Sequence, residues 1–139
     1  MLTHDAQQAL LTWYDDHQRE LPWRLTNDPW AILLSEVLLQ QTQVSRGMVY
    51  WQRMVDAFPT VGSMAQAPVE AVLKAWEGAG YYSRARRLHA LSQRVMLSSS
   101  EGGFDGRLPS SYDELLSLPG IGPYTAAAVA SIAFGQPVA

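Results

Sequence analysis

A single carboxylate, Glu36, lies inside a segment of the sequence that is otherwise suited to burial. Four residues would share its face of a helix, and three of them are aliphatic: Ile32, Leu33, Leu39 and Gln40. Partial desolvation disfavours the charged form of a carboxyl group, so we expect a raised pKa and a proton held near neutral pH. A general acid needs that property. The alternative is a glutamate at the edge of the buried stripe whose carboxylate reaches water or a backbone amide.

A second candidate for chemistry is the sequence LPGIGPYTA at residues 118–126. Gly120 and Gly122 permit backbone dihedrals that other residues avoid, and Pro123 suits the first turn of a helix. They would join two helices in a hairpin whose exposed N–H groups attract phosphate and whose tip lets a nucleic-acid backbone approach. The alternative is an ordinary glycine-capped turn between two core helices. The flanking Leu-Pro and Pro-Tyr-Thr-Ala favour the hairpin.

Positive charge gathers in one part of a chain that is acidic overall. The net charge is −3 and the pI is about 5.5, which by itself argues against a nucleic-acid partner. Residues 78–97, however, contain no acid and carry Arg84, Arg86, Arg87, Arg94 and His89. Arginine is suited to contacts with phosphates and base edges. The run is therefore either a surface that binds nucleic acid or a solvated helix face.

Amide and aromatic side chains next to these segments have two interpretations each. Gln40, Gln41 and Thr42 could read base edges or insert into a base stack, or they could cap helix carbonyls. Tyr81 and Tyr82 follow a glycine and offer aromatic rings for base stacking, or they could anchor the core. Neither group decides between the interpretations alone.

Helices must position all of these residues, since apolar spacing is helical throughout and no segment alternates like a strand. We expect an all-α bundle with short connections and Asp28 as a helix cap. Residues 98–109 form the expected mobile loop, and a short turn lies near Met64. The expected helices cover about 5–17, 29–41, 45–57, 68–76, 82–97, 111–116 and 123–134.

Composition limits the remaining possibilities. The 139 residues, 47% of them hydrophobic, suffice for one domain with a core. The chain has no cysteine, which excludes disulfides and thiolate metal sites within these residues. No apolar run is long enough to span a membrane, and the N-terminus lacks the pattern of a signal peptide. We expect a cytoplasmic protein without a membrane partner, associated with the nucleoid if the source is bacterial.

Five short motifs occur in one order with compact spacing. They lie at residues 21–24 (LPWR), 35–44 (SEVLLQQTQV), 58–60 (FPT), 76–86 (WEGAGYYSRAR) and 118–122 (LPGIG). Together they closely resemble adenine DNA glycosylases of the MutY type, within the helix-hairpin-helix glycosylase superfamily. The resemblance runs from about residue 19 to the end of the chain.

The resemblance implies a fold and an activity. Residues 21–139 would form a six-helix barrel domain with the helix-hairpin-helix motif at about 111–134, and residues 1–20 an N-terminal helix. The family binds double-stranded DNA, flips out adenine paired with 8-oxoguanine or guanine, and hydrolyses its glycosidic bond. Glu36 would protonate the departing adenine. Tyr124 would lie beside the reacting sugar, where related lyases have a lysine, so we expect no strand cleavage.

The resemblance also implies DNA-binding residues. Gln41 and Thr42 would insert into the duplex, Tyr81 would be the aromatic wedge beside 8-oxoguanine, and Gly120 and Gly122 would hold phosphate. Six further residues match positions around the extruded adenine, namely Arg19, Leu21, Trp23, Arg24, Leu39 and Val44. Arg84 and Arg86 from the charged run complete the expected DNA-binding residues.

Some parts that the resemblance implies would lie after Ala139. They are the aspartate that stabilises the sugar cation and the four cysteines that hold a [4Fe-4S] cluster. We therefore expect no cofactor within this chain, little or no activity from the chain alone, and a cluster in the full-length protein. Leu10 and Trp13 would lack a packing partner, which predicts possible self-association. The alternative function is a non-catalytic helix-hairpin-helix module that binds DNA.

Overall fold

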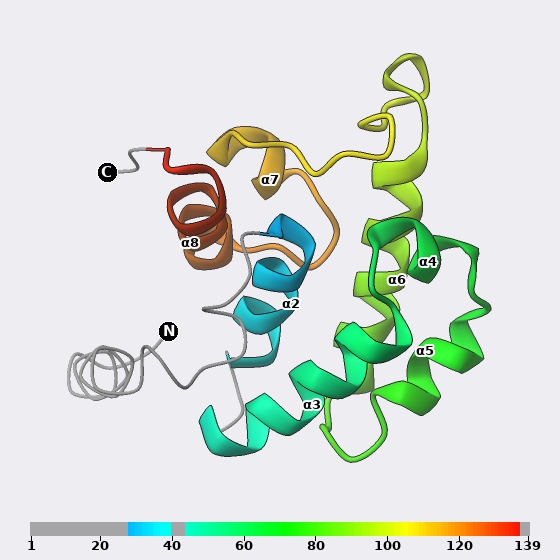
Figure 1. The fold of residues 1–139 in the computed structure, drawn as a ribbon. Helices are drawn as coiled ribbons and strands as arrows, with labels where there is room; N and C mark the ends of the chain where they lie inside the picture. Colours follow the sequence, from blue (N-terminus) through cyan, green and yellow to red (C-terminus); the bar gives the residue numbers. More distant parts are fainter. Residues whose placement is uncertain (1–27, 40–43, 137–139) are drawn as a thin grey trace.

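The computed structural model describes residues 28–39 and 44–136, and all regular structure in these ranges is helical (Figure 1). The all-α prediction is confirmed. The elements in chain order are α2 (Pro29–Leu39), α3 (Val44–Ala57), α4 (Val61–Gln66), α5 (Val69–Ala75), α6 (Tyr82–Met96), the 3-10 turn η2 (Ser99–Glu101), α7 (Tyr112–Leu116) and α8 (Pro123–Phe134).

Helix α2 lies in the middle of the described structure. It packs against α3 and α8, α6 packs against α4 and α5, and α7 pairs with α8 (Figure 1). Leu33, Leu34 and Leu38 of α2 are almost completely buried, together with Met54 of α3 and Leu91 of α6. The apolar run that surrounds Glu36 in the sequence is therefore the centre of the hydrophobic core.

Capping at the start of α2 follows the prediction. Pro29 begins the helix, and the backbone N–H of Trp30 donates to Oδ1 of Asp28 at 3.2 Å. The indole of Trp51, on α3, donates to the carbonyl oxygen of Ala31 at 2.7 Å. These bonds fix the first turn of the helix that carries Glu36.

The predicted turn near Met64 is wrong, because a helix, α4, occupies this place. Thr60 and Ser63 form a reciprocal capping box, in which each side chain accepts from the backbone N–H of the other residue at 3.0 and 3.1 Å. Met64 is completely buried, and Val61 nearly so. Serine replaces the usual Glu or Gln at the last position of the box, which hid the start of the helix from sequence reasoning.

Residues 98–109 are more regular than a mobile loop. Backbone N–H groups of Phe104 and Gly106 donate to the carbonyl oxygen of Val95, and that of Asp105 donates to Leu97. Gly103 is buried against Leu97, where an added Cβ would collide with the backbone. The segment thus folds back onto the end of α6, held by backbone bonds that composition does not reveal.

Several predictions fall outside the described residues. The helix expected at 5–17, the N-terminal segment 1–20 and the last residues of the helix expected to end near 41 belong to this group. Within the described ranges, none of the helices has the length and apolar character needed to cross a bilayer.

Candidate active site

Glu36 lies in the second half of α2 and is partly buried among the aliphatic residues that precede it. Ile32 and Leu33, one turn earlier, are 5% and 0% exposed. Burial raises the pKa of Glu36 from 4.5 to about 7. The predicted raised pKa is confirmed, and the carboxyl group is about half protonated at neutral pH.

Tyr124 lies in the first turn of α8, the helix that packs against α2. The pKa of the Tyr124 hydroxyl is raised, mainly by burial and also by the nearby carboxylate of Glu36. The phenol therefore stays neutral, while 51% of the residue is exposed to solvent. The fold thus brings together Glu36 and Tyr124, which are 88 positions apart in the sequence.

The glycine hairpin between α7 and α8 forms as predicted, although its two glycines differ. Gly120 adopts a φ of +76°, which favours glycine, whereas Gly122 has an ordinary extended conformation with φ −90° and ψ 176°. The expectation of an unusual backbone at Gly122 is therefore wrong, because it is the N-cap of α8 and N-caps take extended dihedrals. An added Cβ at Gly122 would meet nothing within 4 Å, so this side of the tip is open.

A small hollow lies beside this hairpin. It is lined by residues from α2, α6 and the turn, namely Val37, Arg84, Arg87, Leu88, Pro119, Gly120 and Ile121. An added Cβ at Gly120 would lie 2.9 Å from Cβ of Arg87, so only glycine lets the hairpin approach α6 this closely. Two guanidinium groups next to an exposed turn make the hollow suitable for an anion.

The arginines of the charged run divide into two groups. Arg84 is partly buried and donates through Nη1 to the carbonyl oxygen of Val37 at 2.6 Å. Arg94 donates to the carbonyl oxygens of Gly102 and Ser117 at 3.2 and 2.9 Å. In contrast, Arg86 and Arg87 are exposed on α6.

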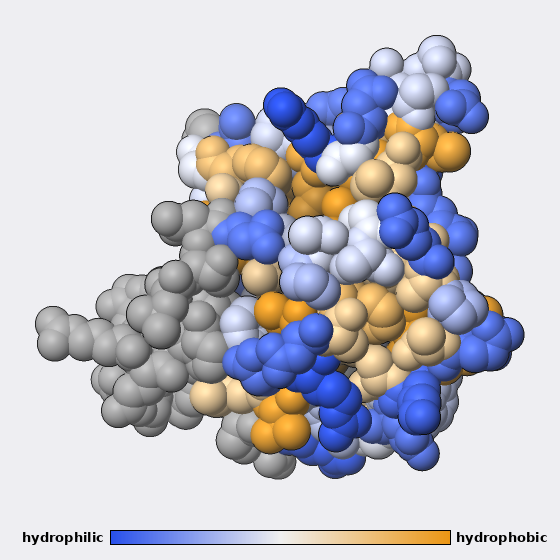
Figure 2. All heavy atoms as spheres, turned by 45° about the vertical axis from the view of Figure 1, so that its right-hand side comes forward, coloured by the Kyte–Doolittle hydropathy of each residue, from blue (hydrophilic) through white to orange (hydrophobic). Residues whose placement is uncertain are grey.

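The charged residues between 78 and 97 are therefore neither all part of a nucleic-acid-binding surface nor all on a solvated helix face. Arg84 is a structural tie between α6 and the helix of Glu36 as well as part of the hollow's lining, which sequence reasoning missed. His89 is also internal, with Nε2 2.8 Å from the carbonyl oxygen of Ala67. On the face shown in Figure 2, hydrophilic surface forms separate patches with apolar surface between them rather than one continuous stripe.

Tyr81 and Tyr82 are not core anchors. They are 67% and 45% exposed, respectively, at the junction between the glycine turn and α6. Tyr81 has φ 54° and ψ 61°, a left-handed conformation that is rare for an aromatic residue. The structure thus presents an aromatic ring to solvent at some cost in backbone energy.

The remaining predicted site residues are only partly described. Leu39 ends α2 and packs, partly buried, against the core. Val44 begins α3, but its side chain is not among the described parts of the structure. Six further predicted residues lie entirely outside the described ranges: Arg19, Leu21, Trp23, Arg24, Gln41 and Thr42. Among the described residues, no group of three or more His, Cys, Asp or Glu side chains could hold a metal ion.

Sequence comparison finds close relatives for most of the chain. Adenine DNA glycosylases from Rattus norvegicus and Homo sapiens are each 43% identical, over 138 and 136 residues, and that of Mycolicibacterium smegmatis is 45% identical over 126. The alignments cover 94%, 92% and 90% of this chain, respectively, but only 26%, 24% and 41% of the relatives. The chain therefore spans less than half the length of these proteins.

Solved structures with the same fold include a DNA glycosylase and an endonuclease in complex with DNA. A thermostable thymine-DNA glycosylase has a TM-score of 0.75 and 30% identity, with 93% of this chain and 58% of that chain covered. Endonuclease III in a non-covalent complex with DNA has a TM-score of 0.69 and 26% identity, with coverage of 97% and 62%.

The family match includes both halves of the candidate site. Residues 34–136, from the middle of α2 to the end of α8, match the family described as HhH-GPD superfamily base excision DNA repair protein. This range contains Glu36, Tyr124 and the glycine hairpin. The chain belongs to the HhH-GPD superfamily of base excision DNA repair proteins.

Proposed function

We propose that the complete protein is a DNA glycosylase that removes adenine paired with 8-oxoguanine or guanine. The observation that carries this proposal is Glu36, a carboxyl group with a pKa of about 7 beside Tyr124 and near the hairpin helix. Relatives at 43–45% identity are adenine DNA glycosylases. A half-protonated acid at neutral pH is matched to the protonation of a leaving purine.

In the proposed reaction, Glu36 donates its proton to the flipped adenine. The bond between the base and the sugar carbon then breaks, and its electron pair leaves with the protonated base as neutral adenine. Water adds to the cationic sugar, and the proton that the water loses returns to the Glu36 carboxylate. Tyr124, held neutral, would lie beside that sugar and supply a hydrogen bond. The second carboxylate expected after residue 139 would stabilise the cation, so the complete protein is needed for full rate.

DNA binding is proposed at the hairpin and the adjacent turn. The backbone N–H groups of Gly120 and Gly122 and the exposed Arg86 and Arg87 would contact phosphate, while Arg84 would act mainly through its bond to Val37. Tyr81 would insert beside the lesion. The roles of Gln41, Thr42 and the residues around the adenine stay proposals that depend on the resemblance alone.

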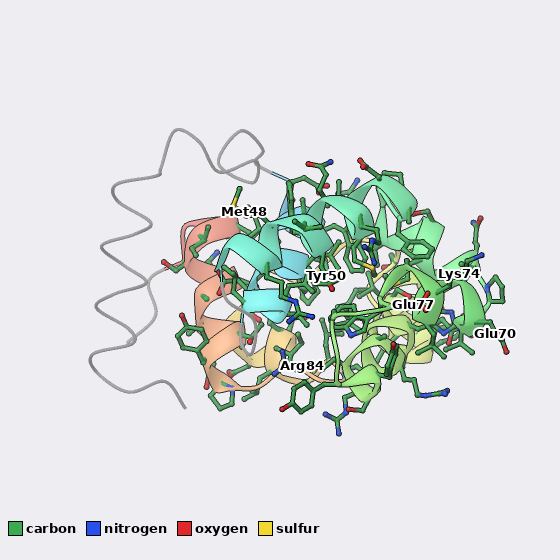
Figure 3. All side chains as sticks on the ribbon, turned by 90° about the horizontal axis from the view of Figure 1, so that it is seen from below. Met48, Tyr50, Glu70, Lys74, Glu77 and Arg84 are labelled. Carbon is green, nitrogen blue, oxygen red and sulfur yellow. The ribbon has the colours of Figure 1, made fainter. Side chains whose placement is uncertain are left out.

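We propose base excision without strand cleavage. A glycosylase that cuts the strand uses an amine to attack the sugar, and the single lysine of the chain, Lys74, lies on α5. Figure 3 shows Lys74 at the edge of the molecule, well away from Arg84 at the hollow. Borohydride treatment during the reaction should therefore trap no covalent adduct with DNA through this chain.

Two further properties of the complete protein are proposed. A [4Fe-4S] cluster would require cysteines outside these 139 residues, because the chain contains none to bind one. An enzyme of DNA repair would also be located with the DNA.

Single-turnover excision of adenine from an 8-oxoguanine duplex tests the proposal in the complete protein. Glu36→Gln should lower the rate by about 10²- to 10⁴-fold, because an amide cannot supply the proton, while duplex affinity stays near that of the wild type. The matched control is Glu70→Gln, which changes an exposed glutamate on α5 (Figure 3). An unchanged rate for Glu36→Gln would contradict the proposal. Duplex binding by a wild type that excises no base would favour the non-catalytic module.

A further inference from the structure

Side chains from two helices hold the turn that carries Tyr81. Arg53 on α3 donates through Nη1 to the carbonyl oxygen of Glu77, and Arg46, also on α3, donates through Nη2 to that of Gly78, each at 2.8 Å. A positively charged donor makes a stronger bond to a carbonyl than a neutral one. Two consecutive peptide groups of the turn are thus tied to α3.

The other side of the turn is tied to the end of α5. The indole of Trp76, which is 2% exposed, donates to the carbonyl oxygen of Gly80 at 2.8 Å. Three of the four carbonyl groups immediately before Tyr81 therefore accept a bond from a side chain. The turn is constrained from two directions.

Tyr50 contacts both arginines that hold the turn. The guanidinium carbons of Arg53 and Arg46 lie over its ring, at 5.0 and 5.7 Å from the ring centroid. An added Cβ at Gly78 would lie 2.7 Å from the Tyr50 hydroxyl, so the ring also supports the turn directly. Figure 3 shows Tyr50 between α3 and the segment of Glu77.

The turn needs such support because its backbone is unfavourable. Gly78, Gly80 and Tyr81 have φ of 92°, 77° and 54°, respectively. The two glycines adopt this conformation without steric cost, but for a tyrosine it costs about 1–2 kcal/mol. The Tyr81 side chain makes no capping hydrogen bond to α6, and the residue is 67% exposed, so packing of its ring does not offset the cost.

We propose that Arg46 and Arg53 are positioning residues that hold Tyr81 in its exposed, left-handed conformation before DNA binds. Their bonds go to the turn, so they would act on mispair recognition through the aromatic side chain. A pre-organised ring loses less conformational entropy on binding than one on a free turn. This inference rests on the proposed function, in which Tyr81 recognises the mispair.

A double-mutant cycle in the complete protein tests the proposal. The measured quantity is mispair preference, the ratio of Kd for a matched duplex to Kd for a duplex with adenine opposite 8-oxoguanine. Arg46→Ala/Arg53→Ala should lower this preference about tenfold, and the same double change in a Tyr81→Ala background should lower it no further. Additive losses would overturn the proposal, as would a double variant with wild-type preference.

Two measurements separate positioning from direct contact with DNA. Arg46→Lys/Arg53→Lys keeps one donor and the charge at each position and should recover part of the lost preference. The dependence of log Kd on log salt concentration should keep its slope in the alanine double variant. A slope reduced by about one per arginine would mean that the arginines contact phosphates, which overturns the proposal.

Controls distinguish this inference from the proposed function. Arg107→Ala removes an exposed arginine from the 98–109 segment and should leave mispair preference unchanged. The Glu36→Gln result tests the chemistry separately, since binding preference does not require excision. If Tyr81→Ala alone keeps full preference, the recognition role of Tyr81 fails and this inference with it, while the role of Glu36 stands.

Discussion

The buried acid on α2 and the exposed turn before α6 obtain their properties in opposite ways. Glu36 is tuned by exclusion of water, and desolvation is the cause of its shifted pKa. Tyr81 is held by added contacts, because side chains from α3 and α5 bind the turn that carries it. Reactivity at one place and orientation at the other therefore depend on different parts of the fold, and mutations should separate them.

A second contrast lies within the turns themselves. Asp105 and Tyr81 are the two residues other than glycine with positive φ in the described ranges, and both have φ 54°. Asp105 offsets the cost locally, since its Oδ1 accepts from the backbone N–H of Ser99 at 2.9 Å and aspartate tolerates this conformation. Tyr81 depends instead on the side chains of Arg46, Arg53 and Trp76, which bind the residues before it. Backbone strain that its own side chain does not offset supports our proposal that the turn of Tyr81 has a functional role.

The largest expected effect concerns pH and separates the acid from the turn. Above pH 7 the protonated fraction of Glu36 falls tenfold per unit, so the excision rate should be about 100-fold lower at pH 9 than its low-pH limit. Mispair preference should change far less over this range. Single-turnover rates and Kd values across pH 6–9 provide the check, and a rate that stays constant to pH 9 would contradict the assignment.

The same pKa predicts a change in stability with a definite sign. Between pH 4.5 and about 7, the folded chain holds a proton on Glu36 that the unfolded chain releases. The contribution to folding is thus fully present below pH 4.5 and is lost as pH rises to about 7, by at most roughly 3 kcal/mol. Urea unfolding at several pH values should show this loss for the wild type and its absence in Glu36→Gln.

The next effect should act on the turn alone. Gly78→Ala places a Cβ at φ 92° and 2.7 Å from the Tyr50 hydroxyl, which should cost about 1–2 kcal/mol in unfolding free energy and weaken mispair preference. Adding Tyr50→Phe removes the clashing hydroxyl and should restore part of the unfolding free energy and part of the mispair preference. The energetic cost of placing alanine at a positive φ would remain. The pH midpoint of excision should not move. A shifted midpoint would show that the two regions are coupled.

The smallest effect is expected at Asp105. Asp105→Ala removes the acceptor for Ser99 and the tolerance of positive φ, so unfolding free energy should fall by about 1 kcal/mol. Asp105→Asn retains both properties and should be close to neutral. Neither change should alter mispair preference. An effect of Asp105→Ala on that preference as large as that of Gly78→Ala would remove the distinction between the turns.

Much of the fold could be predicted because its determinants are local. The start of α2 at Asp28 and Pro29 and the limits of α8 follow from capping residues and apolar spacing. Helix α4 was missed because Ser63 closes its capping box in place of Glu or Gln. The folding of residues 98–109 onto α6 was missed because backbone bonds create it, and these leave no trace in composition.

The candidate site shows the same division. The raised pKa of Glu36 could be predicted since its aliphatic neighbours are one helical turn away in the sequence. The bond from Arg84 to Val37 could not, because it joins residues 47 positions apart. The conformation of Gly122 was also mistaken, since a glycine can adopt either sign of φ and only the position of α8 selects one.

The sequence by itself determined that the chain is helical, that one carboxylate is surrounded by apolar neighbours, and that a glycine hairpin precedes the last described helix. These features depend on residues within a turn or two of one another. Only the tertiary structure decided that Tyr124 lies near Glu36 and that Arg46 and Arg53 hold the turn of Tyr81. Long side chains such as arginine have partners at many sequence distances, and packing of the helices selects which carbonyl groups they reach.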